Sequence, residues 1–183
     1  FVKPVNMGSS VGVVKVDKAA ALIPALDYAL QYDSKVLIEE AIVGREIECA
    51  VLGNNDPSAS IVGEIETDDG FYSYEKKYID EDAAKLKIPA NLDEETMARV
   101  QQVSIAAFKA LEARGMARVD MFLTAAGEIY VNEINTIPGF TSISMYPKLW
   151  QASGLSYTEL IDRLIQLAIE EQQEKAALKT TGY

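Results

Sequence analysis

A predicted β-hairpin carries four polar side chains whose types suit metal binding and the stabilisation of negative charge. The sequence predicts strands over 118–123 and 128–135, joined by a glycine-containing turn at 124–127. If the turn has an even length, Leu123 faces Glu128, and side-chain alternation puts the four polar groups on one face. They are Arg118, Asp120, Glu133 and Asn135. In that register Arg118 lies opposite Glu133 and Asp120 opposite Val131, while Phe122 and Ile129 share the face nearer the turn.

Carboxylate and amide oxygens are ligands that Mg²⁺ prefers, and Mg²⁺ usually completes its octahedron with substrate phosphates. Asp120 and Glu133, side by side, would repel each other unless a cation lay between them. The alternative is a surface salt bridge between Arg118 and Glu133 that leaves Asp120 solvated. The hydroxyl-rich loop 136–144 favours chemistry, because loops leaving a rigid sheet often carry it and Gly139 could bring a backbone N–H close to a substrate oxygen.

The stretch KPVNMGSSVG, residues 3–12, is a second candidate for phosphate binding. It matches neither the P-loop nor the dinucleotide fingerprint, because no lysine follows its last glycine and no helix follows the loop. The β-branched residues behind it predict a strand instead. The loop is therefore expected to be a hairpin turn between strands at 1–3 and 11–16, and phosphate binding stays open on these residues alone.

Composition narrows the classes of function. A net charge of −11 argues against nucleic-acid and anionic-membrane partners, because the general field repels phosphates. The single Cys49 rules out an internal disulfide, suits a reducing cytoplasm and is expected to be a buried structural thiol. There is no His, no 18-residue apolar run and no signal peptide. Because Phe1 already lies in a predicted strand, the chain is expected to begin partway through a larger protein.

The remaining pattern predicts an α+β fold with a mostly antiparallel sheet covered by helices. A helix capped by Asp17 and kinked at Pro24 is expected to run to about residue 31. Further strands are expected at 35–40, 46–52 and 60–65, and polar residues after about 170 are expected to fray.

Two later helices carry clear signals. Asp93 is expected to cap the first, which ends at Gly115, and Ser156 with Glu159 forms a capping box for the second. The inward positions are Met97, Val100, Ser104, Phe108 and Leu111 in the first helix, and Leu160, Ile161, Leu164, Leu167 and Ala168 in the second. Segment 66–89 is aromatic, charged and too long for an ordinary connection, so it is expected to be a functional cover or a surface loop anchored by its aromatic residues.

Five motifs, in order and spacing, resemble the ATP-grasp portion of D-alanine–D-alanine ligases. They are FVKPVNMGSSVGV, LIEEAIVGREIECAVLG, FYSYEKKY, ARVDMFL and VNEINTIPGFTSIS. The resemblance runs from Phe1 to about Ala168, and family enzymes are about twice this length, with an amino-terminal domain that has no counterpart here. It implies an ATP-grasp fold: 1–65 as part of the nucleotide-binding subdomain, 66–89 as an ω-loop lid, 90–175 as the carboxy-terminal subdomain with the metal and oxyanion site, and 176–183 as a tail.

The resemblance also implies roles for single residues around ATP. Lys3 and Lys77 would contact phosphate, the loop at Gly8 would close over the phosphates, Glu39 would lie by the adenine amine, and Glu46 would hold the ribose hydroxyls. The implied ATP-binding set is Lys3, Gly8, Ser9, Ser10, Glu39, Glu40, Ile42, Glu46 and Lys77.

Around the reacting groups, the resemblance implies Mg²⁺, with Mn²⁺ as the alternative ion, bound by Asp120, Glu133 and Asn135. Arg118 and Gly139 would form an oxyanion hole. Ser9 would orient the substrate, Tyr78 would bond to that serine, and Ser144 would contact the carboxylate of the second D-alanine.

The implied reaction phosphorylates D-alanine with ATP and joins the acyl phosphate to a second D-alanine for peptidoglycan synthesis, in a cytoplasmic enzyme that is a homodimer at full length. Tyr78 favours D-alanine as acceptor, because relatives that use D-lactate carry phenylalanine or histidine there. The alternatives are a D-lactate or D-serine ligase, and, for this chain alone, an inactive nucleotide-binding fragment. A purely structural acidic domain would leave the polar cluster unexplained.

Overall fold

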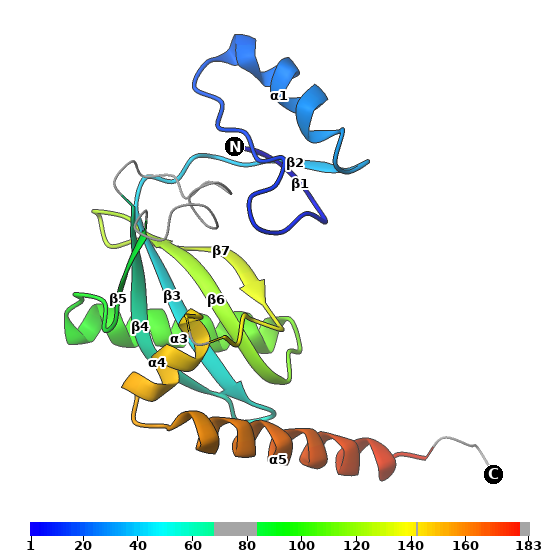
Figure 1. The fold of residues 1–183 in the computed structure, drawn as a ribbon, viewed down its shortest axis with the longest axis vertical. Coiled ribbons are helices and arrows are strands. Elements are labelled where there is room, and N and C mark those ends of the chain that lie inside the picture. The colour runs from blue at the N-terminus through cyan, green and yellow to red at the C-terminus, as the bar shows by residue number, and fades with distance from the viewer. Residues whose placement is uncertain (68–83, 142, 180–183) are drawn as a thin grey trace. The chain divides into compact units, whose positions relative to one another are not determined.

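The computed structural model describes residues 1–67, 84–141 and 143–179 (Figure 1). The chain forms two compact units: Phe1–Val43 with Glu66–Lys85, and Gly44–Ile65 with Leu86–Tyr183. Lys77 and Tyr78 lie outside the described residues, as does most of the predicted lid. At the ends of that segment, strand β4 (Ser58–Thr67) extends to Thr67 and strand β5 (Ala84–Lys87) begins at Ala84. The predicted bounds of the loop, 66–89, were therefore too wide at both ends.

The first unit holds a two-stranded sheet and a short helix. Strand β1 (Val2–Pro4) pairs antiparallel with β2 (Val36–Ile38), and a 3-10 turn η1 (Ala19–Ala21) leads into α1 (Leu22–Ala29). Val2 packs with Ala25 and Ala29 in a small core.

The predicted strand at 11–16 was wrong, and so was the simple hairpin turn before it. Ser9 and Ser10 adopt left-handed φ angles of 58° and 60°. Tight turns follow, in which the Val11 N–H donates to Gly8 O and the Val13 N–H to Ser10 O, at 3.2 and 3.3 Å. Because residues 11–13 take part in these turns, segment 11–16 pairs with β1 through an isolated bridge between Val14 and Val2.

Helix α1 begins later than predicted. Ala21, not Asp17, stands at its N-cap, and Pro24 is its third residue. A proline in the first turn removes an N–H that has no partner within the helix, so it marks the start of the helix and causes no kink.

The second sheet has five strands in the order β5-β4-β3-β6-β7, where β3 is Arg45–Gly53, β6 is Gly115–Leu123 and β7 is Ile129–Asn135. The β3–β4, β3–β6 and β6–β7 pairs are all antiparallel, as predicted. Helix α3 (Glu94–Ala110) covers one face around Val100 and Phe108. Helices α4 (Met145–Ala152) and α5 (Tyr157–Ala176) pack with the residues of the other face, around Tyr146 and Leu149 (Figure 1).

The caps of the long helices were predicted correctly, whereas some details were not. Asp93 Oδ1 accepts the Thr96 N–H at 2.7 Å, and Ser156 with Glu159 forms the capping box. Leu111, Ile161 and Ala168 are exposed, because α3 ends before Leu111 and the other two lie off the buried stripe of α5. Helix α4 was missed, the polar tail stays helical to Ala176, and Gly115 opens β6 instead of ending α3 directly.

None of the helices in the described ranges combines the length and apolar character that crossing a lipid bilayer requires.

Candidate active site

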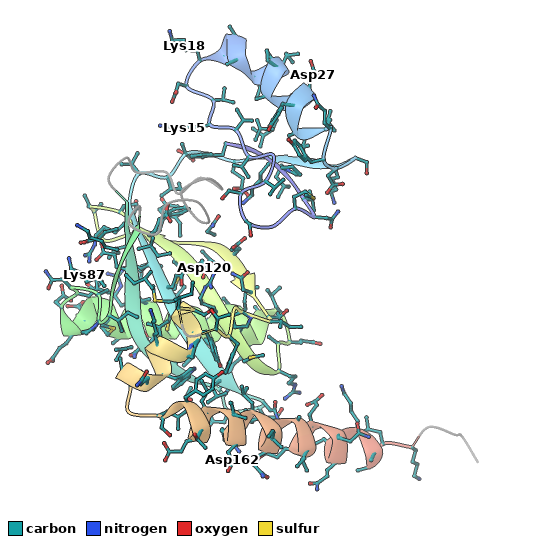
Figure 2. All side chains as sticks on the ribbon, viewed as in Figure 1. Lys15, Lys18, Asp27, Lys87, Asp120 and Asp162 are labelled. Atoms are coloured by element: carbon teal, nitrogen blue, oxygen red, sulfur yellow. The ribbon has the colours of Figure 1, made fainter. Side chains whose placement is uncertain are left out.

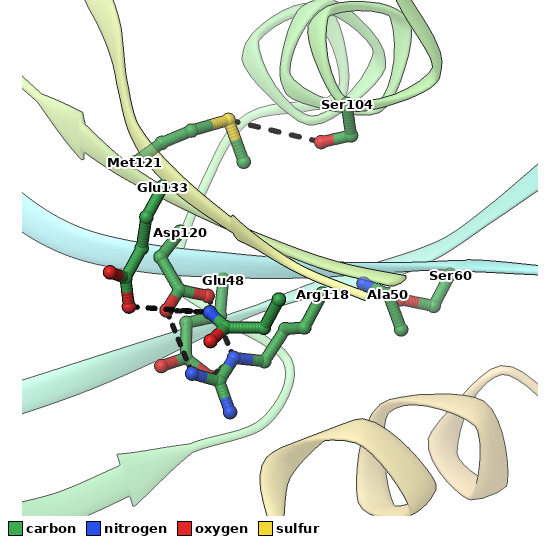
Figure 3. Close-up of polar contacts among 9 residues, drawn as sticks. Glu48, Ala50, Ser60, Ser104, Arg118, Asp120, Met121 and Glu133 are labelled. Carbon is green, nitrogen blue, oxygen red and sulfur yellow. Dashed lines mark hydrogen bonds and ion pairs between the residues drawn. The ribbon is translucent and has the colours of Figure 1, made fainter. Parts of the chain in front are cut away.

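Three carboxylates lie in one row across three neighbouring strands. Glu48 of β3 is paired in register with Asp120 of β6, which is in turn paired with Glu133 of β7. In the next row Arg118 lies between Ala50 and Asn135. All these side chains share the sheet face away from α3; Figure 2 labels Asp120 on the sheet, and Figure 3 shows the group in close-up.

The predicted hairpin register was wrong, yet the four predicted side chains share a face. Leu123 pairs with Ile129, and the Thr124 N–H donates to Glu128 O, so the turn has an odd length that alone would put Glu133 and Asn135 on the other face. A register shift between Asp120 and Met121 leaves Asn132 as an extra residue on β7 and restores the shared face. Near the turn, Tyr130 rather than Ile129 therefore lies opposite Phe122, and Ile129 packs in the α3-side core.

The predicted alternative of an Arg118–Glu133 surface salt bridge is also wrong in its partner. Arg118 donates from Nε to Asp120 Oδ1 and from Nη2 to Oδ2, both at 2.7 Å. Glu48 Oε2 lies 3.1 Å from the same Nε as an ion pair. The Asn135 Nδ2 group donates to Asp120 Oδ2 at 3.0 Å and to Glu133 Oε1 at 3.3 Å. One guanidinium and one amide thus separate the three carboxylates.

Arg118 is a permanent cation at this site. Burial alone would lower its pKa, but the hydrogen bonds and charge of Asp120, followed by the charges of Glu48 and Glu133, raise the pKa above its usual range. Within the described residues its Nη1 group donates no hydrogen bond, and Figure 3 shows that nitrogen pointing away from the carboxylates. Two N–H donors on a fixed cation therefore remain for another oxygen.

The donor chemistry of Asp120, Glu133 and Asn135 fits a Mg²⁺ ion. Asn135 hydrogen-bonds to both carboxylates, so the three groups converge on one point, and turning its amide over would present Oδ1 there instead of N–H. In the part of the chain that the structure describes, no group of three His, Cys, Asp or Glu side chains is arranged to hold a metal. The candidate set therefore has two carboxylates and one amide, with Arg118 on the other side of Asp120.

The loop after β7 brings Gly139 and Ser144 together. The Ser144 Oγ accepts the Thr141 N–H at 3.0 Å and is hydrogen-bonded to Thr141 Oγ1 at 2.9 Å. A Cβ on Gly139 would lie 2.9 Å from that Oγ, so a side chain there would disturb the start of α4.

The first unit holds the predicted phosphate loop and the predicted adenine contact Glu39. Lys3 Nζ lies 2.7 Å from Glu39 Oε2, so the predicted phosphate cation and adenine acid form an ion pair. The loop is fixed by a residue that the sequence did not single out: Asp33 Oδ2 accepts both the backbone N–H and the Nδ2 group of Asn6, each at 2.8 Å. The backbone N–H of Asn6 holds the pKa of Asp33 below its usual range.

Gly44 comes directly before β3, and Arg45 and Glu46 are its first two residues. Glu46 pairs in register with Phe122 and Ile65, on the same face as Glu48 and Asp120. A Cβ on Gly44 would lie 2.7 Å from the Leu123 carbonyl oxygen, so only glycine fits without moving backbone. Arg45 points to the α3 face, where it donates two hydrogen bonds to the buried Glu64, both at 2.7 Å. The other predicted residues of this region, Glu40 and Ile42, lie in the first unit between β2 and β3.

Comparison with known proteins points to one family. The family model described as "D-ala D-ala ligase C-terminus" matches residues 1–166. The D-alanine–D-alanine ligase of Shouchella clausii is 59% identical over the whole of this chain, which covers 50% of that relative. The chain therefore spans about half the length of the curated relatives it matches.

Two solved structures agree with this result. The D-alanine–D-alanine ligase of Coxiella burnetii aligns with a TM-score of 0.84 and 45% identity over 96% of this chain and 46% of its own. The VanG D-Ala:D-Ser ligase of Enterococcus faecalis aligns with a TM-score of 0.83 and 44% identity over 91% and 48%, respectively.

Proposed function

Because this chain belongs to the D-alanine–D-alanine ligase family, we propose that the full-length protein uses ATP to join two D-alanines for peptidoglycan synthesis. The observation that carries the proposal is the pair of carboxylates Asp120 and Glu133, with Arg118 and Asn135 beside them. A sheet face with carboxylate and amide donors next to a fixed guanidinium suits a reaction in which phosphate and acyl oxygens gain negative charge.

The reaction has two steps. The γ-phosphoryl group of ATP passes to a carboxylate oxygen of the first D-alanine, with ADP as the leaving group. The amine of the second D-alanine attacks the acyl carbon and loses a proton, and phosphate leaves as the peptide bond forms. Bound at Asp120, Glu133 and Asn135, Mg²⁺ would neutralise charge on the phosphate oxygens. Arg118, through Nη1, and the Gly139 N–H would stabilise the oxyanion of the second step.

The nucleotide would be held by the residues that the family resemblance implies. Lys3 and Lys77 would bind phosphate, Gly8, Ser9 and Ser10 would cover it, and Glu39, Glu40, Ile42 and Glu46 would hold the adenosine. The Lys3–Glu39 ion pair supports this assignment, because it brings the two side chains together and ATP offers a new partner to each: a phosphate for the lysine and an amine for the carboxylate.

The acceptor is D-alanine in this proposal, on the basis of Tyr78, with Ser144 contacting its carboxylate and Ser9 orienting the first substrate. The similarity to a D-Ala:D-Ser ligase makes D-serine the second candidate. The part of segment 66–89 that lies between β4 and β5 in the sequence would act as the lid. A cytoplasmic location and a homodimer complete the proposal; the buried thiol of Cys49 supports the location alone, because it suits a reducing compartment.

The test is phosphate release from ATP and Mg²⁺ by the full-length protein, with D-alanine alone and then with D-serine or D-lactate added. We expect release that depends on D-alanine, D-alanyl-D-alanine as the product by mass spectrometry, and no mixed product. A mixed product would reassign the acceptor, and no release with any acceptor would refute the ligase. Glu133→Gln should abolish turnover, whereas Glu64→Gln on the opposite sheet face should keep it. We also expect the isolated chain to be inactive.

A further inference from the structure

Glu48 is a buried carboxylate beside the candidate active site that none of the roles above uses. Its side chain is 7% exposed, and its Oε2 lies 3.1 Å from Arg118 Nε. An anion buried to this extent is costly unless it is paired with a cation. The contact with Arg118 provides such a pairing.

The order of the strands gives the two outer carboxylates different neighbours. Strand β6, with Asp120, lies between β3, with Glu48, and β7, with Glu133. Arg118 contacts Asp120 and Glu48 (Figure 3). The Asn135 amide instead donates to Asp120 and Glu133. The candidate metal donors therefore lie on the β6–β7 side of the row, and the contact between Arg118 and Glu48 lies on the β3–β6 side.

A cation on the β6–β7 side would compete with Arg118 for Asp120. Both Asp120 oxygens accept hydrogen bonds from Arg118, at 2.7 Å each. A divalent ion on the same carboxylate would weaken these bonds and repel the guanidinium, because like charges a few ångströms apart repel strongly in a partly buried site. Without a second anchor, Arg118 would leave its place at the step in which its free Nη1 is needed.

We propose that Glu48 is a positioning residue for Arg118: it holds the guanidinium on the sheet face when a divalent cation occupies the Asp120–Glu133 side. Glu48 touches neither substrate nor cation in this role and acts through Arg118. The inference rests on the proposed function for its kinetic consequence, but the ion pair itself does not depend on it.

The kinetic test is a double-mutant cycle in the full-length protein with Glu48→Gln, Arg118→Lys and both together. We expect Glu48→Gln to lower kcat by about 10- to 100-fold with little change in the KM for ATP, since displacement of a catalytic group by about 1 Å has effects of this size. Lysine lacks the planar fork of N–H donors that arginine has. Adding Glu48→Gln to the Arg118→Lys variant should therefore change kcat very little. Equal costs in both backgrounds would overturn the proposal.

The second test does not need ligase activity. The ¹⁵N signal of the Arg118 Nε–H, assigned by its loss in Arg118→Lys, is followed with and without Mg²⁺. With Mg²⁺ present, we expect the Arg118 Nε–H proton to exchange slowly with solvent in the wild type and fast in Glu48→Gln. It should also exchange slowly in the matched control Glu64→Gln, which removes a buried strand carboxylate from an arginine on the other face. Slow exchange in Glu48→Gln would overturn the proposal. Loss of protection only in Glu48→Gln, with no ligase activity in the wild type, would keep this inference and reject the proposed function.

Discussion

Replacing Gly44 with alanine should disturb the start of β3 and with it the proposed nucleotide site. The added Cβ would lie 2.7 Å from the Leu123 carbonyl oxygen, 2.9 Å from its carbon and 3.3 Å from the Thr124 nitrogen. All three are backbone atoms, so no side chain can rotate away. An ordinary contact starts near 3.4 Å, so β3 and the end of β6 must part by about 0.7 Å.

The cost follows from the size of that displacement. Overpacking of this kind destabilises by about 1–3 kcal/mol, and in a domain of this size each kcal/mol lowers Tm by about 2–4 °C. We therefore expect Tm to fall by several degrees. Glu46 lies two residues further along β3, so the KM for ATP should rise by about tenfold, because misplacement by a fraction of an ångström is costly for a positioned group.

Thermal unfolding and the KM for ATP, both measured on the full-length protein, test this prediction. The matched control is Gly127→Asn in the β6–β7 turn, where φ is +79° and the nearest atom to a Cβ is 3.9 Å away. Asparagine tolerates that φ, so the control should change Tm little. An unchanged Tm in Gly44→Ala would refute the steric argument, and a lowered Tm with an unchanged KM would refute the link to Glu46.

Three further predictions concern buried groups. Arg45 holds the pKa of Glu64 below its usual range. The stabilisation from this ion pair is therefore complete above the ordinary glutamate pKa of about 4.3 and is lost as pH falls through the lowered pKa. Glu64→Gln should lower the free energy of unfolding in urea by about 1–3 kcal/mol at pH 7 and by much less near pH 3. Tyr146 donates from its buried hydroxyl to Val51 O at 3.1 Å, so Tyr146→Phe should lose about 1 kcal/mol in the same assay, and an unchanged midpoint would contradict the hydrogen bond. Burial raises the pKa of the Cys49 thiol to about 11, so iodoacetamide at pH 8 should label Cys49 only after unfolding, as mass spectrometry would show.

The sequence was informative wherever a local pattern decided the structure. The family resemblance is confirmed by the match over residues 1–166. Ser156 with Glu159, and Asp93, cap their helices as predicted, because capping needs only residues three apart. The roles assigned to single site residues stay predictions, although the structure places Arg118, Asp120, Glu133 and Asn135 together on one face.

Features that depend on tertiary contacts were missed. Asn132 looks like any strand residue, and the register shift that it creates cannot be read from alternation. The run at 11–16 has strand composition, but the left-handed Ser9 and Ser10 turn the chain before a ladder can form. Glu48 was not predicted as a site residue, because it lies on β3, outside the hairpin of β6 and β7. Only the pairing of β3 with β6 brings Glu48 next to Arg118.

The odd turn and the extra residue Asn132 compensate for each other. Either change alone would move Glu133 and Asn135 to the opposite side of β7, whereas the two together cancel. We therefore expect a single-residue deletion in the turn to keep the shared face only alongside a single-residue deletion in β7. In alignments of related sequences, gaps in the β6–β7 turn should occur together with gaps at Asn132. A relative with only one of the two gaps should lack the candidate metal donors Asp120, Glu133 and Asn135 on one face.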